Sequence, residues 1–316
     1  MATQTRYAPD RGLTVRMTAT MFLLGLVFVA FVALIIGIMT AARASGGAII
    51  LVALIFGGGS AFVSLFYSDK IALAAAGARE VSPREAPQLH AVVDRLCALA
   101  DMDKPRVAIA PTRMANAFAT GRNSKNSVLC VTAGMLGLGL TNEELEGVLA
   151  HELSHVAHKD VQVMTIASLL AIVAGLLVRF AFYSEIFGGG RRGGNNNQAA
   201  LLIPLIMIAS ALVYAISFLL IRMLSRYREL AADRSGALLT GQPSALASAL
   251  QKVSGSMNRI PTQDLRKAEP LNAFFFAPAL KLSGRQSLAA MFSTHPSLDK
   301  RIEQLEKIQR QLGQVG

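Results

Sequence analysis

The sequence has few charged residues and almost no cysteine. Charged residues make up 16% of its 316 positions and hydrophobic residues 53%, whereas about a quarter of the residues in a soluble protein are charged. This composition excludes an ordinary soluble protein and favours a membrane protein. Cys97 and Cys130 are far apart and form no C-x-x-C pair, so we expect reduced, packed thiols in a cytoplasmic domain.

Acidic residues are also scarce, at 20 against 31 basic ones, which gives a net charge of +11. Much of the positive charge lies beside long apolar runs, where the positive-inside bias and anionic lipids explain it. We therefore expect contact with the lipid bilayer and no nucleic-acid partner. The first apolar run is longer than the roughly 7–15 residues of a signal peptide and lacks a clear cleavage signature, so we expect it to remain as an anchor.

Four apolar runs are long enough to cross a bilayer, which takes about 20 residues of helix. They extend from Met17 to Ala42, from Ala44 to Ser68, from Val161 to Tyr183 and from Ala199 to Ile221. Arg179 can snorkel to the interface and Pro204 lies in the first turns of its helix, so neither removes a span. Four spans put both termini on one side, and the flanking lysines and arginines predict that this side is cytoplasmic.

The spans divide the chain into four parts: a tail with two spans at 1–68, a polar segment at 69–160, two spans with their loop at 161–221, and a second polar segment at 222–316. The two polar segments are long enough to fold together as one domain. Apolar periodicity predicts helices near 88–100 and 298–312, and Arg106 to Ala110 and Val128 to Thr132 favour short strands. The predicted fold class is an α+β membrane protein, with four transmembrane helices and a mainly helical cytoplasmic domain that contains a small β-sheet.

The motif H-E-x-x-H occupies residues 151–155 on a predicted helix that begins beside Thr141, which forms a capping box with Glu144. At about 100° per residue, His151 and His155 lie roughly 40° apart on one face, so both imidazoles can reach one ion. Zinc suits neutral imidazole and leaves a coordination position open in catalytic sites. Glu152 projects toward that position, where it can take a proton from an attacking water and deliver it to a leaving amine. The sequence predicts one Zn²⁺ per chain.

The alternative is a coincidental match on an amphipathic helix, which with only five histidines has odds on the order of a few per thousand. The metzincin class would have Gly at position 158 and His at 161, whereas this chain has His158 and Val161, so that class is excluded. The best candidate for the third ligand is Glu229, which shares a helical face with Asp233. His158 lies one turn beyond His155, and we interpret it as a solvated neighbour.

The metal site is predicted to lie close to the membrane. His155 precedes the third span by six residues, which is about 9 Å of helix, and Glu229 follows the fourth span by eight residues, about 12 Å. If both helices continue out of the bilayer, the zinc lies just outside its cytoplasmic surface.

Taken together, these features resemble the HtpX-type membrane zinc endopeptidases, which are related to the CAAX prenyl proteases. The resemblance rests on the paired spans, Asn116-Ala117-Phe118-Ala119, H-E-L-S-H, Glu229 to Asp233 and the late His295-Pro296. It implies that Glu229 is the third zinc ligand, that Asp233 orients a zinc-bound histidine, and that Asn116, Ala117, Phe118 and Ala119 form a substrate-binding edge strand. His295 would steady the developing oxyanion, or alternatively cap the final helix.

The resemblance therefore implies a zinc metalloendopeptidase in a bacterial-type inner (plasma) membrane, multi-pass, with the protease domain and both termini cytoplasmic. Its substrates would be misfolded or damaged membrane proteins, as in protein quality control and stress response. A zinc-binding membrane scaffold or a transporter without proteolytic activity is the alternative. A transporter would hold its ligands near the bilayer midplane, whereas no predicted span has His, Asp or Glu at its centre. Glu152, a base that need not ligate metal, argues against the scaffold.

Overall fold

A computed structural model describes residues 11–41, 47–168, 171, 174–175, 197–257 and 295–313. The chain forms two compact units. One comprises Met1–Val15, Leu65–Gln162 and Ser225–Gly316, and the other comprises Arg16–Ser64 and Val163–Leu224. Most of the third predicted span lies outside the described residues.

The described part of the second unit includes long apolar helices: most of α1 (Arg11–Ala41), most of α2 (Gly47–Ala76) and the first part of α7 (Asn197–Thr240). Within the described residues, two helical stretches are long and apolar enough to cross a membrane, Arg11–Leu34 and Pro204–Thr240. They overlap the first and fourth predicted spans, but the first begins six residues earlier and the second extends beyond Ile221 to Thr240. Four spans and the orientation of the termini stay predictions.

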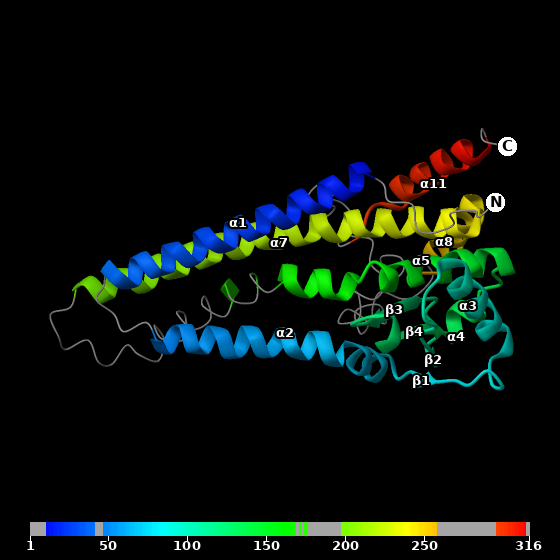
Figure 1. Ribbon diagram of the computed structural model, residues 1–316, viewed down its shortest axis with the longest axis horizontal. Helices are drawn as coiled ribbons and strands as arrows, with labels where there is room; N and C mark the ends of the chain where they lie inside the picture. The colour runs from blue at the N-terminus through cyan, green and yellow to red at the C-terminus, as the bar shows by residue number, and fades with distance from the viewer. Residues whose placement is uncertain are drawn as a thin grey trace. The chain divides into compact units, whose positions relative to one another are not determined.

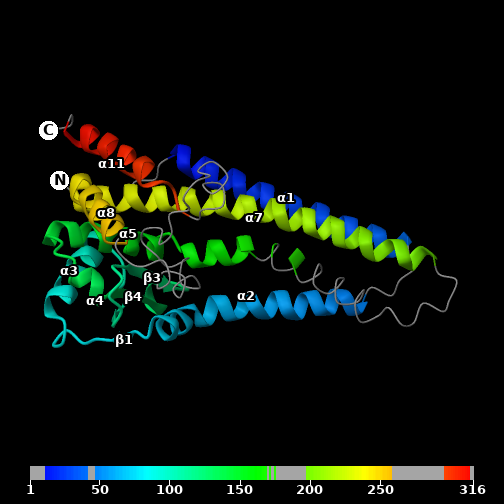
Figure 2. The ribbon, with the colours of Figure 1, turned by 180° about the vertical axis from the view of Figure 1, so that it is seen from behind.

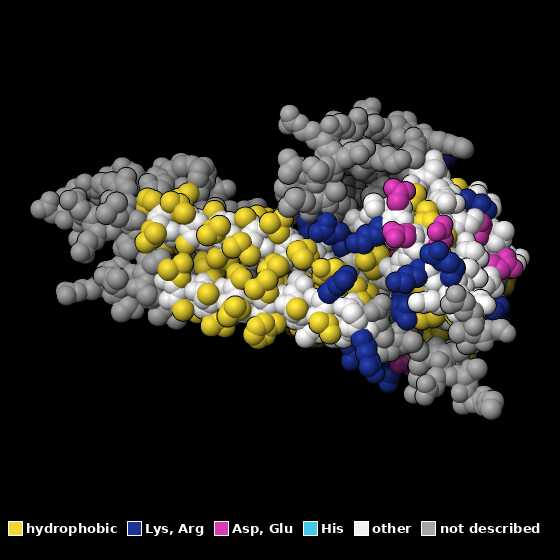
Figure 3. All heavy atoms as spheres, turned by 90° about the horizontal axis from the view of Figure 1, so that it is seen from above, with side chains coloured by type: hydrophobic (Ala, Val, Ile, Leu, Met, Phe, Trp, Pro, Cys, Tyr) yellow, Lys and Arg dark blue, Asp and Glu magenta, His cyan; other side chains and the backbone are white. Residues whose placement is uncertain are grey.

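Large hydrophobic side chains are exposed over the described surface of this unit (Figure 3). Phe22 is 75% exposed and Ile208 is 69% exposed, which would be costly for a surface in water. Among the side chains that the structure describes in this unit, a narrow stripe is buried between the helices, and it includes Leu24, Phe31 and Leu224. The outward apolar surface suits lipid, because helices satisfy their own backbone hydrogen bonds and need none from water.

The first unit contains a small mixed sheet of four strands in the order β1-β2-β4-β3 (Figure 1). The strands are β1 (Arg79–Glu80), β2 (Arg106–Ala110), β3 (Ala117–Gly121) and β4 (Ser127–Thr132). β2 and β4 are parallel, and the other two pairs are antiparallel. The small sheet and the two strands expected at β2 and β4 are confirmed, and β3 lies at one edge of the described sheet.

Helices cover both faces of this sheet (Figure 2). Alternate strand residues enter opposite cores, as the pleat of a strand requires. Val107, Leu129 and Val131 pack into the core shared with α3, α5 and α8, whereas Ala108, Val128 and Cys130 pack against the end of α2.

The unit's remaining described helices are α3 (Pro87–Ala100), the one-turn α4 (Ala133–Leu136), α5 (Asn142–Ala157), α8 (Pro243–Met257), α11 (Leu298–Gly313) and the 3-10 turn Ser124–Asn126.

The start of α5 is fixed by the predicted capping box. The Glu144 backbone N–H donates to the Thr141 hydroxyl at 3.2 Å, and the Thr141 backbone N–H donates to the Glu144 carboxylate at 2.8 Å. The same carboxylate accepts hydrogen bonds from Ser248 and Lys252 of α8, at 2.6 and 2.7 Å. The cap therefore also holds α5 against α8.

The two helices that carry the predicted metal site leave it differently. α5 ends at Ala157, His158 caps it, and Lys159 takes a left-handed conformation with φ of 56°. Helix resumes only at residue 160, so the helix of the motif does not run straight on toward the third apolar run. In contrast, α7 continues without a break from the fourth apolar run through Glu229.

Candidate metal centre

Three side chains from two helices converge on one point. His151 and His155 lie one turn apart on α5 and Glu229 lies on α7, and their candidate ligand atoms all fall within 4.8 Å of one another. The two Nε2 atoms face each other at 3.3 Å. Glu229 lies 3.5 Å from Nε2 of His155 and 3.9 Å from Nε2 of His151. Ligands at 2.0–2.1 Å from a tetrahedral ion are about 3.3 Å apart, so these residues fit one metal ion with a position left open.

Both histidine rings are held from behind by carboxylates. Nδ1 of His151 donates to Asp233 at 2.9 Å, and Nδ1 of His155 donates to Asp160 at 2.5 Å. With the proton on Nδ1, the lone pair of Nε2 points to the cluster, which is the tautomer that a metal needs. Asp233 thus lies behind His151, and Asp160, which belongs to no sequence motif, lies in the same way behind His155.

Each supporting carboxylate is paired in turn with a buried arginine. Arg301 of α11 donates two hydrogen bonds to Asp233, at 2.6 and 2.7 Å, and is 1% exposed. Arg228 of α7 contacts Asp160 at 2.6 Å and is 9% exposed. Neither arginine stood out in the sequence, because both lie far along the chain from their partners and belong to no local motif.

Glu152 lies on α5 beside the cluster and is 4% exposed. Its Oε2 accepts a hydrogen bond from the backbone N–H of Ala119 at 3.2 Å. Burial raises the pKa of Glu152 to about 8, against the opposing positive charge of His155 and with a further upward contribution from Glu229. A bound cation would oppose this shift, because a nearby positive charge favours the carboxylate.

The two histidines differ in their protonation. Burial lowers the pKa of His151 and outweighs the opposing effect of the hydrogen bond that its ring donates to Asp233. Burial also acts to lower the pKa of His155, but Asp160 and the neighbouring carboxylates raise it to about 9. In the metal-free protein a proton therefore competes for His155, and a metal must displace it.

His295 also reaches the cluster. It is buried, and its Nδ1 lies 3.0 Å from Oε2 of Glu229. The start of α11 is instead capped by Ser297, whose hydroxyl accepts the Lys300 backbone N–H at 3.4 Å. His158 is not one of the three clustered residues; it is half-buried at the end of α5, and burial lowers its pKa.

The segment expected to bind substrate forms the edge of the sheet. Asn116 directly precedes β3, and its carbonyl accepts the Thr132 backbone N–H at 2.9 Å. Main-chain N–H and C=O groups alternate in direction along an antiparallel strand. Since the Asn116 carbonyl points toward β4, those of Phe118 do so too, whereas those of Ala117 and Ala119 point away from β4. The Ala119 N–H is the one that meets Glu152. The outer edge of β3 therefore lies beside Glu152, next to the cluster.

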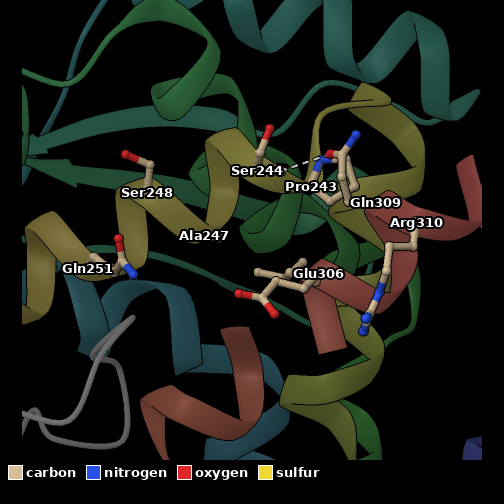
Figure 4. Close-up of a pocket in the computed structure, with 9 residues that line it drawn as sticks. Pro243, Ser244, Ala247, Ser248, Gln251, Glu306, Gln309 and Arg310 are labelled. Atoms are coloured by element: carbon tan, nitrogen blue, oxygen red, sulfur yellow. Dashed lines mark hydrogen bonds between the residues drawn. The ribbon is translucent and has the colours of Figure 1, made fainter. Parts of the chain in front are cut away.

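A pocket of about 430 Å³ lies elsewhere in the same unit, between α8 and α11 (Figure 4). Ser244, Ala247 and Glu306 are among its lining residues, and the Ser244 backbone N–H donates to Gln309 across it at 3.3 Å. None of the metal-cluster residues lines it. The cluster and the edge strand, rather than this pocket, combine the groups that can do chemistry.

Comparison with known proteins agrees with this geometry. Residues 83–309 match peptidase family M48. The chain belongs to peptidase family M48. It is 55% identical to protease HtpX homolog 1 of Streptomyces coelicolor, over 99% of this chain and 98% of that protein. It is also 50% identical to the protease HtpX homolog of Moorella thermoacetica, over 96% of both chains. The crystal structure of S. mikatae Ste24p is more distant, at 18% identity and a TM-score of 0.46 over 87% of this chain and 65% of that one.

The expected resemblance to HtpX-type proteases is confirmed by these relatives. As a member of peptidase family M48 with long apolar helices, the chain is a membrane metalloprotease. This assignment replaces the alternatives of a zinc-binding scaffold or a transporter without proteolytic activity. The family implies a metal cofactor, for which the His151, His155 and Glu229 cluster offers suitable ligands.

Proposed function

We propose that this M48 protease is a zinc endopeptidase in which His151, His155 and Glu229 hold one zinc ion per chain. The observation that carries the proposal is the pair of Nε2 atoms facing each other at 3.3 Å, with the Glu229 carboxylate beside them. Two imidazoles and one carboxylate are a ligand set of catalytic zinc sites. The carboxylate partners of both Nδ1 atoms favour the neutral tautomer that such a site uses.

Zinc in this cluster would supply Lewis-acid activation of a water and of the peptide carbonyl. In our proposal, Glu152 takes the proton of the attacking water and delivers it to the nitrogen of the leaving amine. Asp233 keeps the ring of His151 in place. His295, which contacts Glu229 at 3.0 Å, is proposed to steady the negative charge that develops on the carbonyl oxygen.

The substrate is proposed to bind as an additional strand along the outer edge of β3, the edge that faces away from β4, from Asn116 through Ala117 and Phe118 to Ala119. Main-chain hydrogen bonds at a sheet edge recognise extended backbone rather than a particular sequence. Only an unfolded or locally extended segment can offer such backbone. This selectivity supports misfolded or damaged proteins as the substrate class.

We further propose a multi-pass protein of a bacterial-type inner membrane, with the protease domain and both termini cytoplasmic and membrane proteins as substrates. Support comes from α7, one helix that carries both the fourth apolar run and Glu229. The four sequence segments 1–68, 69–160, 161–221 and 222–316 would then alternate between membrane and cytoplasm. A cysteine placed at the exposed Lys307 should react with a membrane-impermeant maleimide only after cell lysis. Labelling in intact cells would show that the C-terminal segment lies outside the cytoplasm and would contradict the proposed orientation.

The catalytic assignment is tested with full-length protein in detergent. Glu152→Gln should retain zinc and lose cleavage of an unfolded protein such as casein, because the amide cannot accept the proton. Glu143→Gln is the matched control, since this exposed acid lies on the same helix and its loss should change neither property. Undiminished cleavage by Glu152→Gln would contradict the proposed role.

A further inference from the structure

The break at the end of α5 places a carboxylate behind His155. On a continuous helix, residues five apart are separated by about 140° around the axis, so Asp160 would point away from His155. Instead, His158 ends the helix and Lys159 turns the chain through a left-handed conformation, with φ of 56°. Oδ2 of Asp160 consequently lies 2.5 Å from Nδ1 of His155.

Arg228 holds this carboxylate from the opposite helix. Its guanidinium contacts Oδ2 of Asp160 at 2.6 Å, and Asp160 is 2% exposed. Arg228 immediately precedes Glu229 on α7. The ion pair between Asp160 and Arg228 therefore connects the support of His155 to the residue next to the third proposed ligand. A buried ion pair gains little net stability, because removing both charges from water costs about as much as their attraction returns. Its position at the metal cluster suggests a role other than stability.

We propose that Asp160 and Arg228 are positioning residues for His155: Asp160 accepts the Nδ1 proton and fixes the ring, and Arg228 fixes Asp160. This inference rests on the proposed metal site. It makes the support of the two histidines symmetrical, since Asp233 and Arg301 hold His151 in the same way. Neither Asp160 nor Arg228 touches the metal position itself.

A purely structural role would have a different signature. If the ion pair only tied α5 to α7, its loss would lower the stability of the metal-free protein and leave the zinc affinity of the folded protein unchanged. If it positions His155, its loss weakens metal binding and alters the coordination geometry in protein that is still folded. Outer partners of metal-binding histidines typically contribute about 10–100-fold to metal affinity.

The experiment removes the metal from the purified full-length protein and titrates zinc against a chromophoric chelator. Asp160→Asn should bind zinc about 10–100-fold more weakly, and Arg228→Gln about 10-fold more weakly, because it acts through Asp160. Arg228→Lys keeps a positive charge within reach and should recover part of that loss. Lys159→Gln is the control, because it removes an exposed charge beside Asp160 and should stay within about twofold of the wild type. The visible spectrum of the cobalt-substituted protein should change in Asp160→Asn and Arg228→Gln only.

Folding is followed by a thiol-reactive dye, since both cysteines are free and buried. If Asp160→Asn does not fold, the comparison of Arg228→Gln with Arg228→Lys decides. Zinc affinities within twofold of the wild type and unchanged cobalt spectra in the folded variants would overturn the inference, as would an equal loss in Lys159→Gln. A wild-type protein that takes up no zinc would overturn the proposed metal site itself, so the two failures are distinguishable.

Discussion

At the scale of single residues, the metal centre contains buried charged side chains that compensate one another in pairs. Asp233 is 0% exposed and Arg301 is 1% exposed, and they make two hydrogen bonds with each other. Removing one member of a buried ion pair leaves the other uncompensated, at a cost of about 3–5 kcal/mol, whereas replacing both by apolar groups is often neutral. The same Asp233 holds Nδ1 of His151, so its loss affects both the fold and the metal.

We therefore expect Asp233→Asn to lower the free energy of unfolding of the metal-free protein by about 3–5 kcal/mol. The double variant Asp233→Asn with Arg301→Met should lose less than the two single variants together, because no unpaired charge remains. Chemical unfolding followed by dye labelling of Cys97 and Cys130 measures all three. Additive losses would show that the two side chains are not coupled.

At the scale of elements, the geometry of the cluster depends on how closely α5 and α7 approach. Gly236 of α7 lies directly against the backbone of His151: a Cβ placed there would be 2.8 Å from its nitrogen and 3.1 Å from its Cα. Backbone atoms cannot rotate aside as a side chain can. Any side chain at position 236 must push the helices apart and move Glu229 away from the histidines.

Gly236→Ala should therefore lower stability by about 1–3 kcal/mol, the usual range for an overpacked contact, and should weaken zinc binding as well. Gly255→Ala on α8 is the control, because in the described part of the chain no atom beyond its own turn of helix lies within 4 Å of the added Cβ. An alanine there should be neutral or stabilising by up to about 1 kcal/mol. Zinc titration measures the metal affinity of both variants, and thermal unfolding measures their stability. Equal affinities and equal stabilities of the two variants would contradict the close approach of α5 and α7 at Gly236.

A second contact between elements is the Glu144 carboxylate, which joins the cap of α5 to Ser248 and Lys252 of α8. Burial alone would raise the pKa of Glu144, but these hydrogen bonds lower it below the usual 4.5. A carboxyl group with a lowered pKa stabilises the fold above its unfolded pKa and loses that contribution as the pH falls below it. Glu144→Gln should be less stable than the wild type by about 1–3 kcal/mol at pH 7. The gap should shrink between pH 5 and 3, and a gap that persists would contradict this account.

Sequence alone predicted the elements whose signals are local. The capping box located the start of α5 at Asn142, and the short apolar runs at 106–110 and 128–132 located β2 and β4. Asp160 was missed because its position is off the histidine face of a continuous helix, and the left-handed turn at Lys159 has no glycine or asparagine to announce it. Arg301 was missed because its partner Asp233 lies 68 residues away. The edge strand β3 was implied by family resemblance rather than by its own pattern.

At the scale of the whole molecule, a metal would act as a cross-link between segments that are far apart in sequence. His151 and His155 come from α5, whereas Glu229 comes from α7. An ion that binds only the folded state stabilises it by an amount that grows with its concentration, about 2.7 kcal/mol at 100 times the dissociation constant.

Removal of the metal by a chelator should thus lower the apparent melting temperature, and added zinc should restore it in a concentration-dependent way. Glu229→Gln should show a smaller restoration at the same zinc concentration, because one ligand is weakened. The dye assay is suited to this measurement, since burial raises the pKa of the Cys97 and Cys130 thiols to about 11 and 12 and keeps them unreactive until unfolding. A melting temperature that is indifferent to zinc would contradict the cross-link.

The central claim, that His151, His155 and Glu229 hold a zinc ion, is tested most directly by X-ray absorption at the zinc edge of the purified protein. We predict nitrogen and oxygen ligands at about 2.0–2.2 Å, with scattering from two imidazole rings. A sulfur shell near about 2.3 Å, or scattering from a number of imidazoles other than two, would contradict the site.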